Sequence, residues 1–66
     1  MDAKKIGKIL RELRGTRSLN EVAGPVGIAT TTLSMYENGE RIPRDVIKIK
    51  LAEFYGKSVL DIFYTN

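Results

Sequence analysis

Two short helical segments with a tight connection between them constrain this chain more than any other feature of its sequence. Ser18-Leu19-Asn20-Glu21 has the form of a capping box, in which a hydroxyl and a carboxylate satisfy free amides at a helix start. A short apolar face follows, and Gly27 is suited to end this first helix. A second helix is expected over residues 30–37, because Asn38-Gly39 is a pair suited to a left-handed helix end. Only three or four residues then remain for the turn.

Pro25 conflicts with a regular first helix. Counted from Ser18 as the N-cap, Pro25 lies inside the helix, where its ring removes a backbone hydrogen bond at a cost of about 3 kcal/mol. Gly24 adds about 1 kcal/mol to that cost. Two interpretations stay open. Either the helix stops or kinks at Ala23 without functional consequence, or the distortion shifts the turn and re-aims the second helix.

The rest of the chain predicts three more helices and no strand. Apolar residues at helical spacing mark a helix over residues 3–14, namely Ile6, Ile9, Leu10 and Leu13. A further helix is expected over residues 45–55, ended by Gly56, and Ser58 can cap a last helix over residues 59–63. The predicted fold class is all-α: one compact domain of five helices spanning residues 1–66.

Two short helices joined by a tight glycine turn form the helix-turn-helix arrangement, whose second helix enters the major groove of DNA. At these residues the chain resembles the phage lambda-type repressors and Cro proteins, the XRE-like regulators. The resemblance extends from about Ile6 to Phe63 and is carried by Ala23, Gly27, Leu33-Ser34, Glu37-Asn38-Gly39, Pro43, Leu51-Ala52, Tyr55-Gly56 and Leu60-Asp61-Ile62-Phe63. It implies a lambda-repressor-like fold with the helix-turn-helix at about residues 18–38.

The basic residues lie on both sides of an uncharged segment. The net charge is only +3, but no charged residue occurs between Glu21 and Glu37, whereas six basic residues lie within residues 4–17 and four within residues 41–50. This distribution suits a surface that contacts phosphates on either side of a helix that reads bases. The alternative is that the basic side chains simply solvate helix faces, and for the N-terminal group both interpretations stay open.

The resemblance places the base-contacting residues near the start of the helix over residues 30–37 and one turn later, at Thr30, Thr31, Ser34 and Met35. None of these side chains can make the bidentate contacts of Arg with guanine or of Gln with adenine. The expected contacts are single hydroxyl hydrogen bonds and methyl contacts with thymine. Thr30 has the alternative role of a capping hydroxyl, and Leu33 and Tyr36 are expected to point inward.

The resemblance also implies contacts with DNA phosphates. Family members often have Gln at the first residue of the first of the two helices, but this chain has Leu19, which can offer only its backbone amide. The expected phosphate-contacting residues are Leu19 through that amide, Thr32, Asn38, Arg41, Arg44 and Lys50.

Two supporting interactions follow from the same comparison. Arg14 and Glu37 occupy positions at which the family forms a partly buried salt bridge that holds the recognition helix, the alternative being two exposed charges. Lys48 stands where the family usually has an apolar residue. Either Ile47 and Ile49 replace that packing, or the lysine stem snorkels along the apolar surface and keeps its amine in water.

Composition excludes several classes of function. The chain has no Cys and no His, so the usual nucleophile, general base and zinc ligands are absent, and no catalytic residue, metal or cofactor is expected. No apolar run approaches the roughly 20 residues of a membrane span, no signal peptide is recognisable, and no small-molecule ligand is evident. We expect a protein of the cytoplasm, acting on the nucleoid of a bacterial or phage-infected cell.

The expected function is that of a sequence-specific regulator of transcription that binds double-stranded DNA, a repressor or Cro-like switch of a phage or mobile element. The alternative is an antitoxin-like or adaptor module whose main partner is another protein. Because one such domain accounts for all 66 residues and leaves nothing to bind a toxin, the sequence favours the regulator.

A homodimer on a pseudo-palindromic operator is also expected, because one helix-turn-helix reads only a few base pairs. The segment from Val59 to Tyr64 carries more apolar area than one short terminal helix needs. Leu60 and Phe63 are expected in the core, which leaves Val59, Ile62 and Tyr64, with Phe54, for the partner's surface. The alternative is that all of them pack onto the chain's own core.

Overall fold

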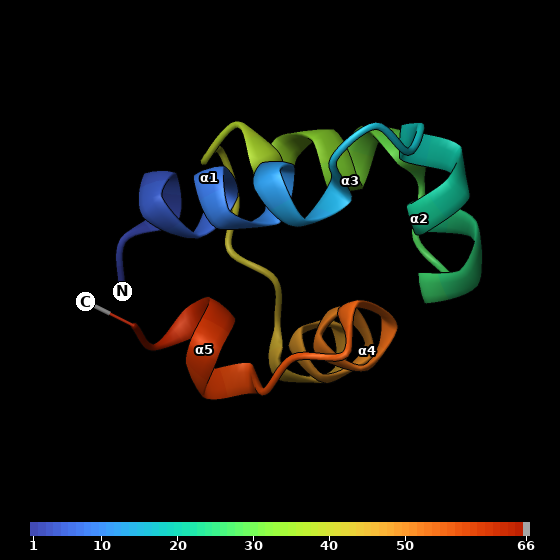
Figure 1. Ribbon diagram of the computed structural model, residues 1–66. Helices are drawn as coiled ribbons and strands as arrows, with labels where there is room; N and C mark the ends of the chain where they lie inside the picture. Colours follow the sequence, from blue (N-terminus) through green and yellow to red (C-terminus); the bar gives the residue numbers. More distant parts are fainter. Residues whose placement is uncertain (66) are drawn as a thin grey trace.

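The computed structural model describes residues 1–65, and within this range it contains five helices and no strand. They are α1 (Ala3–Arg14), α2 (Leu19–Val26), α3 (Thr30–Glu37), α4 (Asp45–Tyr55) and α5 (Val59–Phe63). In Figure 1, α1 and α3 lie side by side in one layer, α4 and α5 form a second layer, and α2 closes one end. The predicted all-α, five-helix fold is confirmed.

Side-chain caps explain where three of the helices begin. The Asp2 carboxylate accepts hydrogen bonds from the amides of Lys4 and Lys5 at 3.1 and 3.2 Å, and so starts α1. The Ser18 hydroxyl accepts from the Glu21 amide at 3.1 Å, and the Glu21 carboxylate accepts from the Ser18 amide at 3.4 Å, which completes the predicted capping box of α2. The Ser58 hydroxyl caps α5 in the same way.

The N-terminus of α3 has no such cap. Its N-cap residue is Ala29, which makes no side-chain hydrogen bond to the helix, and Thr30 is already the first helical residue. The alternative role of Thr30 as a capping hydroxyl is therefore wrong, because a cap must precede the helical residues whose amides it satisfies.

Pro25 does not end α2. The helix continues through Pro25 to Val26 and ends at Gly27, whose φ of 85° is left-handed. The amides of Gly27 and Ile28 both donate to the Ala23 carbonyl, at 2.9 and 3.0 Å. The expectation that α2 stops at Ala23 is wrong, since the buried side chains of Val22, Ala23 and Val26 hold the last turn in place.

One apolar core lies between the two layers. Leu10 of α1, Leu33 of α3 and Leu51 of α4 are each 0% exposed. Leu33 and Tyr36 both point inward, as expected for residues three apart on one helix face. Gly7 allows α1 to lie directly on the end of α3, because a Cβ there would overlap with the Glu37 carbonyl oxygen.

Two expectations from the sequence about α5 are wrong. Ile62 is 1% exposed and so cannot contribute to a partner's surface, whereas Leu60, expected in the core, is 69% exposed. The reason is helical geometry: Val59, Ile62 and Phe63 share the face that packs onto the core, which turns Leu60 outward. Tyr64, which follows the helix, is half exposed.

Lys48 is buried between α4 and α5, with only 6% of its surface exposed. Its Nζ donates a hydrogen bond to the Tyr64 hydroxyl at 3.1 Å and lies 3.5 Å from the Asp45 carboxylate. The hydrogen bond to Tyr64 raises the pKa of Lys48 above its ordinary value. Ile47 joins the core as expected, but Ile49 is exposed, so the buried lysine stem supplies the remaining packing.

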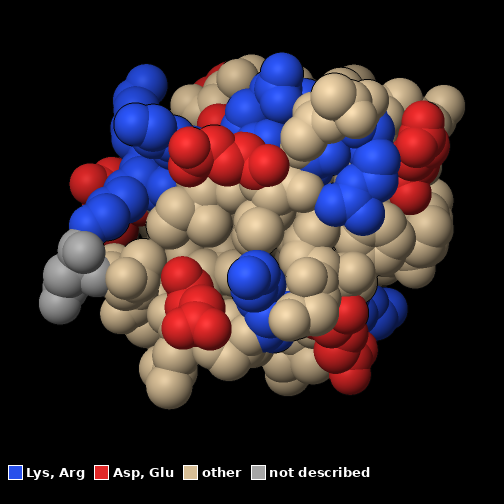
Figure 2. Space-filling view, viewed as in Figure 1, with Lys and Arg blue, Asp and Glu red and all other residues tan. Residues whose placement is uncertain are grey.

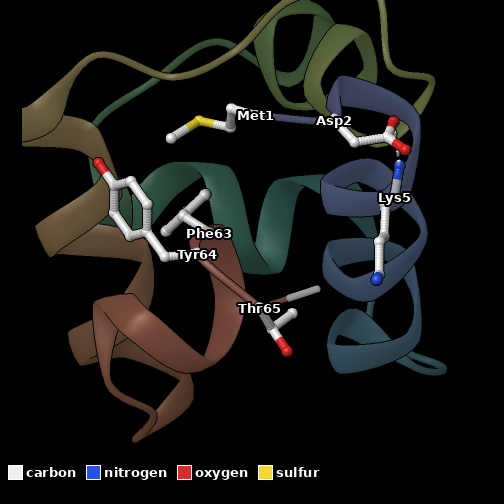
Figure 3. Close-up of a pocket in the computed structure, with 6 residues that line it drawn as sticks. All are labelled: Met1, Asp2, Lys5, Phe63, Tyr64 and Thr65. Atoms are coloured by element: carbon white, nitrogen blue, oxygen red, sulfur yellow. Dashed lines mark hydrogen bonds between the residues drawn. The ribbon is translucent and has the colours of Figure 1, made fainter.

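The two ends of the domain meet beside this lysine. Met1, Asp2 and Lys5 face Phe63, Tyr64 and Thr65 across an open hollow (Figure 3). In Figure 3 the Tyr64 hydroxyl points away from the hollow, toward the neighbouring helix, which agrees with its bond to Lys48. Tyr64, which follows α5 directly, is therefore held in a defined position.

Candidate nucleic-acid interface

The outer side of α3 presents short side chains. Thr31 and Met35 are exposed, and Thr30 and Ser34 are half-buried. Thr31 and Met35 are four residues apart, so they lie on the same side of the helix, about 6 Å apart along its axis. This side is opposite to the one that buries Leu33. The outer side of the helix therefore carries two threonines, each with a hydroxyl and a methyl group, one serine hydroxyl and one thioether.

Ser34 and Asn38 interact with each other at the end of α3. The Asn38 amide Nδ2 donates to the Ser34 hydroxyl at 3.4 Å and to the Glu40 carboxylate at 3.5 Å. Of the four expected base-contacting residues, Ser34 thus already has a polar partner on its own helix. Asn38 is exposed, as a phosphate contact requires.

Three of the expected phosphate-contacting residues meet around one hollow of about 330 Å³, which we call the arginine hollow. Thr32 lines it from α3, and Arg41 and Arg44 line it from the loop between α3 and α4. Among the described residues around it, none is acidic; the others are Gly27, Ile28, Tyr36, Ile42 and Ile47. Two guanidinium groups beside a hydroxyl suit the oxygens of a phosphate.

The other two expected phosphate contacts lie elsewhere. Lys50 is exposed on α4 and lines a separate hollow with Pro25 and Glu53. Leu19 is the first residue of α2, and its side chain is partly buried against the core. Only its amide, at the positive end of the helix dipole, is suited to an anion.

Arg14 and Glu37 form a two-point ion pair that joins α1 to the end of α3. Arg14 Nε lies 2.8 Å from Glu37 Oε2, and an Arg14 terminal nitrogen donates to Oε1 at 3.0 Å. The side chains are 14% and 5% exposed, respectively. The hydrogen bond with Glu37 raises the pKa of Arg14, so the guanidinium stays charged. This pair ties the C-terminal end of α3 to α1.

Arg17 has a structural role that the sequence analysis missed. Its guanidinium carbon lies 5.3 Å from the ring centroids of both Phe54 and Tyr55, and its nitrogens donate to the carbonyls of Leu13 and Arg14 at 2.8 and 3.3 Å. Arg17 thus caps the C-terminus of α1 and ties it to α4. The position of an arginine just beyond a helix end could have indicated the cap, but the sequence does not indicate its aromatic partners, which are 37 and 38 positions away.

The N-terminal basic group is therefore divided between two roles. Arg14 and Arg17 are engaged in contacts that hold α1, and Arg11 donates to the Gly15 carbonyl at 3.2 Å. The lysines of α1, at positions 4, 5 and 8, are exposed. Figure 2 shows basic side chains gathered on the half of the molecule that carries α1, with acidic side chains among them. Part of this group is structural, and its lysines remain available to phosphates.

Two observations bear on other classes of site. Residues 1–65 contain no group of three or more His, Cys, Asp or Glu side chains placed to hold a metal ion. No helix in the described part of the chain is long and apolar enough to cross a membrane.

A glycine turn between α2 and α3, an outward-facing α3 and an adjacent arginine hollow together define a helix-turn-helix DNA-binding domain. The chain belongs to the helix-turn-helix family whose model matches residues 8–62. The match covers α2, α3 and α4 completely, α1 except its residues 3–7, and α5 except its last residue.

Two curated relatives show the same similarity. The chain is 38% identical over 55 residues to a cryptic phage CTXphi transcriptional repressor, RstR, of Vibrio cholerae, which covers 80% of the chain and 50% of the relative. It is 36% identical over 47 residues to an uncharacterized HTH-type transcriptional regulator, YvzC, of Bacillus subtilis, which covers 71% and 61%. The chain thus matches about half to three-fifths of the length of these proteins.

A solved structure shows the same fold. The clp gene regulator ClgR of C. glutamicum superposes with a TM-score of 0.82 over 97% of this chain and 86% of that chain, at 23% sequence identity. At this identity the likeness concerns the arrangement of the helices.

Proposed function

We propose that this chain is a sequence-specific regulator of transcription, a repressor or Cro-like switch, that binds an operator in double-stranded DNA. The observation that carries the proposal is the position of α3, which exposes Thr31 and Met35 beside the arginine hollow. The similarity to a phage repressor and to an HTH-type transcriptional regulator supports the same function and an origin in a phage or mobile element. The site of action is the nucleoid, in the cytoplasm of a bacterial or phage-infected cell.

In the proposed complex α3 lies in the major groove. Thr30, Thr31, Ser34 and Met35 face the base edges. Phosphates on one side contact the arginine hollow through Thr32, Arg41 and Arg44, and Asn38, Lys50 and the Leu19 amide contact phosphates nearby. No catalytic step and no cofactor belongs to this mechanism.

Two copies of the chain are proposed to bind a pseudo-palindromic operator. A two-fold axis would set the two α3 helices about 34 Å apart on one face of the duplex, which doubles the length of the site. The surface for the second copy is the outer side of α5, where Leu60 is 69% and Tyr64 is 50% exposed, with the partly buried Val59 at its edge. Burial of two such apolar side chains by a partner is favourable.

Selection of bound duplexes from a random pool, followed by affinity measurement at several salt concentrations, tests the proposal. Six phosphate contacts would give log K against log salt a slope of about −5. Arg41→Ala and Arg44→Ala should each weaken binding to all sequences and reduce the slope by about 1. Lys57→Ala is the control, since Lys57 is exposed on the link between α4 and α5 and should change neither value. Binding that ignores salt, or no enriched sequence, would favour the protein-interaction alternative.

The proposed dimer is tested by sedimentation of the protein alone and on the selected site. Two copies per palindromic site are expected, and Leu60→Asp or Tyr64→Asp should reduce this to one. Ile49→Asp is the matched control, because Ile49 is an equally exposed apolar residue on α4. A one-to-one complex on every selected site would exclude the dimer. If only Ile49→Asp abolished the dimer, the dimer interface would lie on α4 instead of α5.

A further inference from the structure

The outward face of α3 carries no side chain that can make a bidentate hydrogen-bonded contact with a base. The Ser34 hydroxyl accepts a bond from Asn38 and so has only its own O–H left to donate, and Thr32 lines the arginine hollow. Within the first six residues of α3, the two side chains that are exposed are Thr31 and Met35, and Met35 is 37% exposed. One offers a methyl group beside its hydroxyl, and the other offers a thioether chain whose sulfur is only a weak acceptor.

The four bases differ in what they offer to such side chains. In the major groove adenine, guanine and cytosine present only hydrogen-bond donors and acceptors, whereas thymine also presents its C5 methyl group. An apolar chain pressed against a donor or acceptor leaves that group without its water and without a partner, which is unfavourable. The same chain against a methyl group removes apolar surface from water, which is favourable.

We infer that this protein selects its operator by thymine methyl groups, with Thr31 and Met35 as the specificity-determining residues. The inference rests on the proposed function, in which α3 enters the major groove. Because the two residues lie about 6 Å apart along the helix and base pairs are spaced about 3.4 Å apart, they reach two thymines separated by about two base-pair steps in each half-site. Thr30 and Ser34 contribute only single hydroxyl hydrogen bonds to base edges, and the remaining contacts go to phosphates.

The experiment replaces each thymine of the selected operator, one at a time, by uracil. Uracil keeps the base pairing and the O4 acceptor and lacks only the C5 methyl group, so it isolates the proposed contact. One or two replacements in each half-site should weaken binding about fourfold, the effect of exposing one methyl-sized apolar group. Replacements at the other thymines should leave the affinity unchanged.

Variants of the two residues assign each thymine to its partner. With Met35→Ala the affinity ratio between the thymine and uracil operators should fall to one at a single position, and Met35→Leu should retain the ratio because leucine keeps the apolar bulk. Thr31→Ser removes the methyl group and should abolish the ratio at the other position. Thr31→Val keeps the methyl shape without the hydroxyl and should preserve it. Lys57→Ala should leave every ratio unchanged.

Two failures can be told apart. If salt-dependent binding to a selected sequence persists while uracil at every position binds as well as thymine, the thymine inference is wrong and the proposed function stands. If Thr31→Ser preserves the ratio and Thr31→Val abolishes it, the hydroxyl is the reading group, which also overturns the inference. If no sequence is enriched from the pool, the proposed function fails first and the inference fails with it.

Discussion

Removal of the Arg14 side chain is the most informative perturbation of this fold, because it leaves a buried carboxylate without its partner. Glu37 is only 5% exposed and receives two hydrogen bonds from Arg14, at 2.8 and 3.0 Å. Breaking such a pair from one side costs about 3–5 kcal/mol. The whole stability of a domain of this length is roughly 3–10 kcal/mol. Arg14→Ala should therefore remove a large part of it.

Thermal unfolding followed by circular dichroism measures the effect. In a domain of this size each kcal/mol shifts the midpoint by about 4–8 °C, so Arg14→Ala should lower it by at least about 12 °C. Glu37→Gln alone should also destabilise the fold, because the buried guanidinium loses its counter-charge. The double variant should recover part of the loss, with a coupling energy of about 0.5–3 kcal/mol. Lys8→Ala, an exposed change on the same helix, should leave the midpoint unchanged.

The refuting result is additivity. If the double variant loses the sum of the two single losses, to within about 0.5 kcal/mol, the two side chains do not stabilise each other. A midpoint for Arg14→Ala equal to that of Lys8→Ala would equally show that the pair behaves as two exposed charges.

Three further predictions concern the packing of the helices. Gly7→Ala should strongly destabilise the fold, since the added Cβ would overlap with the Glu37 carbonyl oxygen. Gly24→Ala should raise the unfolding midpoint, because a Cβ there would have no other atom within 4 Å. Equal effects of the two changes would contradict the close approach of α1 and α3. Tyr55→Phe should unfold at the same or a higher temperature at pH 7, because the Tyr55 hydroxyl is buried without a partner among the described residues. Burial raises the pKa of the Tyr55 hydroxyl above its ordinary 10.0, so this hydroxyl keeps its proton to a higher pH in the folded state than in the unfolded chain. The unsubstituted protein should therefore lose more stability than Tyr55→Phe as the pH rises above 10. Lys48→Met should keep stability within about 1 kcal/mol, because an apolar chain of similar volume replaces a buried cation, whereas Lys48→Ala should destabilise clearly in the same urea titration.

Much of the candidate site could be predicted from the sequence, because its parts follow from local position on one helix. The inward direction of Leu33 and Tyr36 fixes the outward direction of Thr31 and Met35, and helical periodicity alone determines this. The meeting of Thr32 with Arg41 and Arg44 around one hollow could not be derived locally. It depends on the path of the loop between α3 and α4.

The sequence by itself determined the number of helices and most of their ends. Capping hydroxyls and carboxylates at helix starts, and glycines with left-handed φ at helix ends, act over three or four residues, so they can be recognised without the fold. The bounds of α1, α3, α4 and α5 agree with those expected from the sequence, whereas α2 continues through Pro25 to Val26 instead of stopping at Ala23.

Only the tertiary structure decided which side of the shortest helix is buried and which charges support the fold. In α5 four of the five residues are apolar or aromatic, so the sequence contains too little periodicity to distinguish Leu60 from Ile62. Which side of α5 is buried depends on its contacts with α4 and α1. Arg17 contacts Phe54 and Tyr55, which lie 37 and 38 positions further along the sequence, and Lys48 contacts Tyr64, which lies 16 positions further along. Such partners are set by how the layers pack, because the free energy of a buried charge depends on groups that only the folded chain brings near it.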